Sequence, residues 1–209
     1  MARLLGDAYK GEAERYNGGA LCIFRLAPQD YHRFHSPVDG VIGPMTYISG
    51  EYYTVNVSFC ALLAIVVVID SALCIQPQAI RTALDVYGEN ARKIVPIVSP
   101  QFGHVMAVCV GAMMVGSIKT TVNEGDTVKR GQEFGYFAFG ELGLLVTGGD
   151  SLTDERLPQG GSTIVVLFEK GAVEWDEDLL INSRACLETL VRVGMGIGRS
   201  RRAAAASST

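Results

Sequence analysis

The sequence contains few of the residues from which metal centres and disulfide frameworks are built. Its 209 residues include five cysteines and three histidines, and no two cysteines form a CxxC pair. The cysteines lie far apart in a chain that is long enough to bury a core without covalent cross-links. We therefore expect reduced thiols, no metal site and no disulfide framework.

A concentrated basic face is also absent. The chain carries 18 lysines and arginines against 22 acidic residues, which gives a formal net charge of −4. Nucleic-acid binding needs clustered positive charge to contact phosphates, and here the basic residues are scattered until the C-terminal segment. We therefore expect no nucleic acid among the partners.

Long apolar runs without charge are missing as well. The best candidate, residues 57–75, approaches membrane-spanning length but contains Asp70, whose charge is costly in lipid. We expect this run to form a buried strand or helix, with a transmembrane helix as the alternative. The start of the chain runs from Met1 into polar residues and shows no secretory signal.

Glycine, by contrast, is frequent, and glycine and proline together interrupt most of the sequence. The 24 glycines and seven prolines divide a chain that is 48% hydrophobic into short apolar, β-branched segments, which is typical of strands joined by turns. The fold class that we expect is α+β and mainly β, a single domain over residues 1–209 with antiparallel sheets in a barrel-sandwich-like arrangement and a few short helices. The expected strands are 19–26, 46–57, 102–114 and 163–169, and the expected helices are 4–16 and 178–193.

Residues 122–135 predict a hairpin with glycine-rich turns. The same pattern occurs in lipoyl and biotinyl carrier domains, which display a lysine on a tight turn. Lys119 lacks the flanking residues of such a turn, so a swinging-arm carrier is the alternative and not the main interpretation.

Two clusters carry candidate chemistry. Residues 30–40 hold two of the three histidines, His32 and His35, together with two acids. Histidine is the natural acid and base near neutral pH, and a carboxylate can orient its ring. The alternative is a polar turn with a hydrogen-bonded structural histidine.

The second cluster is the Gly-Gly-Ser-Thr sequence at 160–163, which is followed directly by an apolar, strand-like run. Ser162 follows a glycine, and glycine tolerates the strained backbone that an attack of the serine hydroxyl on the preceding carbonyl requires. A surface turn is the alternative interpretation.

Together these clusters, and the segments 24–29, 111–118 and 168–171 in the same order along the chain, closely resemble the phosphatidylserine decarboxylase family. The resemblance covers most of residues 4–199 and corresponds to the C-terminal part of that family. It implies that Ser162 attacks the carbonyl of Gly161, that the chain splits there, and that Ser162 becomes a pyruvoyl cofactor. The products would be a β chain, 1–161, and an α chain, 162–209, that stay bound to each other.

The resemblance also implies roles for the site residues. A pyruvoyl group supplies the electron sink that decarboxylation of an amino acid requires and that no side chain offers. By position, His35 corresponds to the base for self-cleavage and His32 to the acid that protonates the product, with Asp30 supporting the histidines. The residues alone do not separate the two histidine roles.

The family resemblance implies phosphatidylserine in a membrane surface as substrate and phosphatidylethanolamine as product. We expect a membrane-associated, intracellular protein, with the organelle left open between Golgi or endosome and the mitochondrial inner membrane, and a dimer of the processed heterodimer. The C-terminal segment interleaves arginines with apolar residues, and there we expect a solvated tail, with a weak lipid contact as the alternative.

The chain departs from the family pattern in three places. An aspartate thought to complete a Ser-His-Asp arrangement lies in a segment upstream of this chain, and residues 57–76 and 141–159 are inserts. We hypothesise that both inserts are introns translated in frame. Two alternatives to a phosphatidylserine decarboxylase therefore stay open: a pyruvoyl-dependent decarboxylase of a small amino acid, and an inactive truncated remnant of the family.

Overall fold

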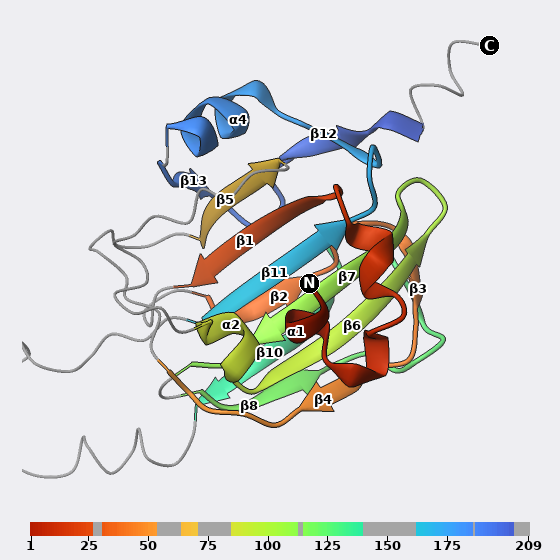
Figure 1. Ribbon diagram of the computed structural model, residues 1–209, viewed down its shortest axis with the longest axis vertical. Coiled ribbons are helices and arrows are strands. Elements are labelled where there is room, and N and C mark those ends of the chain that lie inside the picture. The colour runs from red at the N-terminus through yellow and green to blue at the C-terminus, as the bar shows by residue number, and fades with distance from the viewer. Residues whose placement is uncertain are drawn as a thin grey trace, which may run out of the picture.

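The computed structural model describes residues 1–26, 31–53, 64–70, 85–112, 115–139, 162–185 and 187–202 (Figure 1). Its helices are short: α1 (Ala2–Leu5), the 3-10 helices η1 (Asp7–Tyr9) and η2 (Ala13–Tyr16), α2 (Val86–Glu89) and α4 (Glu177–Arg184). Its strands are β1 (Ala20–Leu26), β2 (Arg33–His35), β3 (Gly40–Ile42), β4 (Thr46–Ile48), β5 (Ala64–Asp70), β6 (Arg92–Ser99), β7 (Gly103–Val110), β8 (Val115–Thr120), β9 (Thr127–Val128), β10 (Glu133–Phe139), β11 (Ser162–Phe168), β12 (Val173–Trp175), β13 (Thr189–Val191) and β14 (Gly198–Ser200).

A large antiparallel sheet forms the centre of the molecule. Its strand order is β13-β5-β1-β11-β7-β6-β3-β9, with β4 also paired to β6. Every residue of β11 is buried, because β1 and β7 flank the strand and side chains cover both of its faces. A strand buried on both faces has a continuous apolar sequence, as residues 164–168 do.

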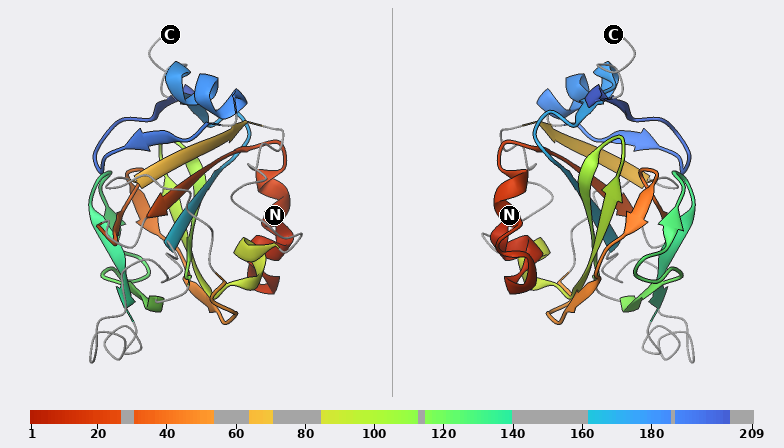
Figure 2. Two further views of the ribbon diagram at one scale, coloured as in Figure 1. Left: turned by 90° about the vertical axis from the view of Figure 1, so that its left-hand side faces the viewer. Right: turned by 90° about the vertical axis from the view of Figure 1, so that its right-hand side faces the viewer.

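Two layers cover the two faces of this sheet. On one face lies the three-stranded sheet β2-β10-β8, and the core between the sheets includes Phe34. The ring of Phe34 packs edge-on against the rings of Phe134 and Phe137, with ring centroids 4.8 and 5.1 Å apart. On the other face a second core packs around Leu5 and Tyr16 from the N-terminal helices. Figure 2 shows these layers on either side of the large sheet. The mainly β, antiparallel α+β class is confirmed.

The part of the chain that the structure describes does not have the barrel-like closure that we expected. Among the described residues the large sheet has two ends, β13 and β9, and does not close on itself. The strand expected at 46–57 is described only as β4, whereas β1, β7 and β11 lie within a few residues of their expected positions.

Both expected helices are shorter than predicted. The segment 4–16 forms α1, η1 and η2 in place of one helix, and Gly6, with φ of 72°, ends α1. The segment 178–193 is helical only as far as Arg184 and then becomes β13, whose residues pair with β5. Periodicity failed here because a pairing between distant segments outweighed the local helical pattern.

Residues 122–135 do not form a hairpin on their own. The antiparallel partners are β8 and β10, and the connection between them contains β9, which pairs with β3 of the large sheet, Val128 opposite Gly40. Lys119 lies inside β8 opposite Tyr136 and not on a tight turn, so the structure removes the carrier interpretation.

The apolar run at 57–75 contains a strand, as expected. Residues 64–70 form β5, which pairs with β1 on one side and β13 on the other. The rest of the predicted insert 57–76 and the whole of the predicted insert 141–159 lie outside the described residues. None of the helices in the described part of the chain has the length and apolar character needed to cross a membrane.

Candidate active site

Ser162 is the first residue of β11 and is fully buried. It lies opposite Leu26 of β1, and its Oγ has no hydrogen-bond partner among the described residues. Side chains alternate along a strand, so Ser162 shares one face of the sheet with Ile164 and Val166. Ile164 and Val166 line a cavity on that face, and Ser162 lies on the same face of the strand but is fully buried and is not itself a lining residue.

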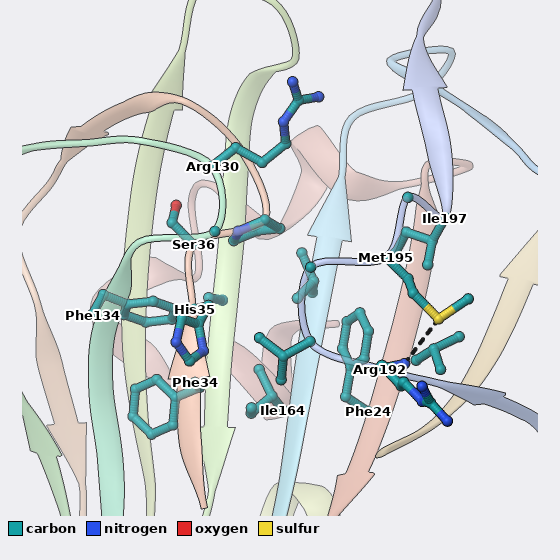
Figure 3. A pocket seen from close by; sticks show the side chains of 18 of the residues that line it. Phe24, Phe34, His35, Ser36, Arg130, Phe134, Ile164, Arg192, Met195 and Ile197 are labelled. Carbon is teal, nitrogen blue, oxygen red and sulfur yellow. Dashed lines mark hydrogen bonds between the residues drawn. The ribbon is translucent and has the colours of Figure 1, made fainter. Parts of the chain in front are cut away.

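The cavity has a volume of about 500 Å³ and lies between the two sheets. Its walls come from β1, β2, β11, the turn around Gly131, and the connection between β13 and β14 (Figure 3). Most lining side chains are apolar: Phe24, Leu26, Phe34, Pro37, Phe102, Ala107, Phe134, Ile164, Val166, Val191, Val193, Met195 and Ile197. A site with these walls suits a ligand that is partly apolar.

His35 is the predicted histidine that the structure places in the cavity wall. It ends β2, and its ring stacks on that of Tyr31 with centroids 5.7 Å apart. Burial lowers the pKa of His35 from its ordinary value of 6.5, although Glu133 opposes the shift. Its Nδ1 is buried and without a hydrogen-bond partner among the described residues. A neutral imidazole of this kind can accept a proton at neutral pH.

The segment that follows His35 is held by hydrogen bonds to the turn at 130–132. The N–H of Ser36 donates to the carbonyl of Gln132, and the N–H of Gly131 donates to the carbonyl of Ser36, both at 2.8 Å. The Ser36 hydroxyl donates to the carbonyl of Val38 at 2.7 Å. These contacts fix the position of the His35 backbone in the cavity wall.

Of the remaining predicted site residues, His32 is described and Asp30 and Gly161 are not. His32 precedes β2, is half-buried, and its carbonyl accepts a hydrogen bond from the N–H of Phe137 at 2.9 Å, but it does not line the cavity. Asp30 and Gly161 lie outside the described residues. Their predicted roles therefore stay predictions.

Three arginines that motif analysis did not assign to the site line the cavity. Arg33 pairs with Glu133 at 2.6 Å and lies over the ring of Tyr136, 5.3 Å from its centroid. Arg130 and Arg192 are exposed. The interleaving of arginines and apolar residues after β13 was the only signal in the sequence that pointed to Arg192.

A buried ion pair lies on the opposite face of the sheet. Arg25 of β1, 5% exposed, pairs with Glu188, and Arg25 stands opposite Thr163, the residue after Ser162. Burial raises the pKa of the nearby Tyr87, with Arg25 acting against that shift and Glu188 in favour of it. No sequence pattern indicated this cluster.

The two cysteines in the core are not candidate nucleophiles. Cys22 and Cys109 are free and fully buried, and burial raises the pKa of both thiols. A thiol reacts as its thiolate, which a raised pKa suppresses at neutral pH.

Comparison with known proteins identifies the family. The family model described as phosphatidylserine decarboxylase matches residues 1–153. The chain is 49% identical over 199 residues to phosphatidylserine decarboxylase proenzyme 3 of Schizosaccharomyces pombe and 44% identical over 196 residues to proenzyme 2 of Saccharomyces cerevisiae. It is 34% identical over 202 residues to the phosphatidylserine decarboxylase proenzyme of Chlamydia caviae.

These matches cover nearly all of this chain but only part of each relative. They span 95%, 94% and 97% of the chain, against 16%, 14% and 54% of the three relatives. The chain thus corresponds to about half of the bacterial proenzyme and to a much smaller share of the fungal ones. It belongs to the phosphatidylserine decarboxylase family.

Proposed function

We propose that this chain contains the catalytic part of a phosphatidylserine decarboxylase proenzyme, which converts phosphatidylserine to phosphatidylethanolamine and carbon dioxide. The observation that carries the proposal is the position of Ser162, buried at the start of β11 with an unpaired Oγ on the side of the sheet where His35 lines the cavity. A buried hydroxyl without a partner is costly for folding, and a chemical role is a reason to retain it.

In the proposed self-cleavage, the Oγ of Ser162 forms a bond to the carbonyl carbon of Gly161 while the peptide C–N bond breaks, which leaves an ester and a free amine. Removal of the α proton of Ser162 then expels Gly161 as a carboxylate. Water replaces the nitrogen, which departs as ammonia, and a pyruvoyl group begins the chain 162–209. His35, which burial keeps neutral, is the proposed base.

The buried Ser162 hydroxyl, which has no hydrogen-bond partner among the described residues, is consistent with this conversion, because the pyruvoyl group would form where that side chain now lies. When present, the pyruvoyl group supplies the electron sink for loss of carbon dioxide. Leu26 and Ile164 exclude water around it, and the substrate amine would approach from the cavity. His32 is the proposed proton donor to the product, with Asp30 supporting the histidines.

The pairing of β11 supports lasting association of the two proposed chains. β11 belongs to the segment 162–209, and it is hydrogen-bonded to β1 on one side and β7 on the other, both of which belong to 1–161. Cleavage of one peptide bond leaves these ladders intact. A dimer of the processed heterodimer remains a prediction.

The cavity supports a lipid over a free amino acid as the substrate. A volume of about 500 Å³ with mainly apolar walls exceeds what a serine molecule needs, and it suits a headgroup joined to apolar chains. Because such a substrate resides in a bilayer, we propose that the protein works at a membrane surface inside the cell.

An intact-mass measurement of the purified chain tests the proposal. We expect two fragments that divide between Gly161 and Ser162, the second lighter by one ammonia than a fragment with an N-terminal serine. Ser162→Ala should give a single chain of 22.4 kDa. Carbon dioxide release from phosphatidylserine, compared with that from free serine, then identifies the substrate. A wild-type chain that stays whole would favour an inactive remnant, and release from serine alone would favour the amino-acid decarboxylase.

A further inference from the structure

The connection between β13 and β14 forms one rim of the cavity and exposes apolar side chains at the same time. Val193 and Met195 both line the cavity, yet they are 57% and 55% exposed. Figure 3 shows Met195 and Arg192 at the edge of the cavity beside Phe24. Large exposed apolar side chains are common singly, but here two of them flank the mouth of a candidate lipid site.

The backbone of this rim is a closed turn. The N–H of Met195 donates to the carbonyl of Arg192 at 3.0 Å, and the N–H of Arg192 donates to the Sδ of Met195 at 3.2 Å. Gly194 has φ of +89°, as the third residue of a type II turn requires. This turn, Arg192–Met195, therefore presents Val193 at its tip and needs little further ordering to bind a partner.

The charge around the turn is positive. The guanidinium of Arg192 has no acidic partner among the described residues, unlike Arg33 and Arg25, which pair with Glu133 and Glu188. Residues 189–198 include no acid. An apolar tip beside an unpaired arginine matches the acyl and phosphate layers of an anionic bilayer.

We propose that the turn Arg192–Met195 docks the cavity mouth on an anionic phospholipid surface. Val193 and Met195 enter the boundary of the acyl chains, and Arg192 contacts phosphate groups at the level of the headgroups. A lipid could then enter the cavity headgroup first while its chains remain in the bilayer. This inference rests on the proposed function, because it assigns the place where the lipid substrate reaches the site.

Vesicle cosedimentation tests the docking surface. The chain should carry Ser162→Ala, so that binding is measured on one uncut polypeptide. We expect it to partition onto phosphatidylcholine vesicles that contain phosphatidylserine more strongly than onto phosphatidylcholine alone, and less strongly as salt increases. Val193→Asp and Met195→Asp should each lower the partition coefficient about tenfold, and Arg192→Ala about fivefold.

Two variants outside the turn serve as matched controls. Val98→Asp changes an apolar residue of β6 that is 45% exposed, and Arg201→Ala removes an exposed arginine near the end of β14. Both should bind vesicles as the parent chain does. Thermal melting of all variants checks that they are folded, and Val193→Ser offers a milder change with the same expected direction.

The inference is overturned if the turn variants bind vesicles as well as the controls do, or if the parent chain shows no preference for the anionic vesicles. These results would leave the proposed function intact, because splitting at Ser162 in the wild-type chain is measured without lipid. Conversely, a wild-type chain that fails to split would contradict the proposed function while the vesicle measurement stands.

Discussion

Arg25 and Glu188 form an ion pair on the face of the large sheet opposite the cavity, and Ser162 lies between them in the sequence. Their side chains are 6% and 22% exposed, so the pair is largely shielded from water. If the chain splits at Ser162, this contact joins the two products in addition to the pairing of β11.

Removal of one partner should destabilise the fold. Glu188→Ala leaves Arg25 buried without its counter-ion, and we expect the free energy of unfolding to fall by about 3 kcal/mol. Urea denaturation of the uncut Ser162→Ala chain measures this loss. The double change Arg25→Met with Glu188→Leu should recover part of it, because it removes both charges from the interior. Equal stability of Glu188→Ala and its parent would contradict a structural role for the pair.

The pH dependence of stability should reveal His35. Burial lowers its pKa in the folded chain below 6.5, so between these two values the unfolded chain binds more protons. Stability is therefore fully present above pH 6.5 and is lost as the pH falls through the folded pKa. As the pH falls through that window, the urea concentration at the midpoint of unfolding should decrease in the Ser162→Ala chain. It should decrease less in a Ser162→Ala chain that also carries His35→Gln. An equal dependence of the urea midpoint on pH in both chains would contradict the lowered pKa of His35.

The two histidines should separate in their effects on cleavage. His35 lines the cavity and His32 does not, so His35→Ala should slow splitting at Gly161–Ser162 by about a hundredfold or more, the usual contribution of a general base. His32→Ala should split at a rate close to wild type but release less carbon dioxide. Timed gels and carbon dioxide release measure the two steps. A His32→Ala chain that fails to split would reverse the assignment.

Gly135 should be intolerant of any side chain. A Cβ at this position would overlap the ring of Phe34 and lie 2.5 Å from the carbonyl oxygen of Lys119. Because Phe34 precedes His35 in β2, Gly135→Ala should displace the site as well as lower stability by about 2 kcal/mol. Gly125→Ala is the contrasting surface variant: its φ of +86° strains an alanine and should lower stability, but the open space around it should leave the splitting rate unchanged. Unfolding and splitting rates test both, and a Gly135→Ala chain as stable and active as wild type would refute the packing argument.

The sequence alone determined the fold class and the strands of the centre. Short apolar, β-branched runs at β1, β7 and β11 bury themselves wherever the chain places them, so a local pattern was sufficient to locate them. Ser162 and His35 were also predicted from the sequence, because they lie in motifs that resemble those of the family, and their chemical roles stay predictions.

Only the tertiary structure decided which distant segments meet. The pairing of β13 with β5 ended a helix that periodicity had extended through Val193, and the pairing of β9 with β3 divided the expected hairpin. The cavity, its arginines and the pair of Arg25 with Glu188 likewise join residues far apart in the chain. Such contacts depend on how strands are ordered in the sheet, and a local pattern of side chains carries no information about that order.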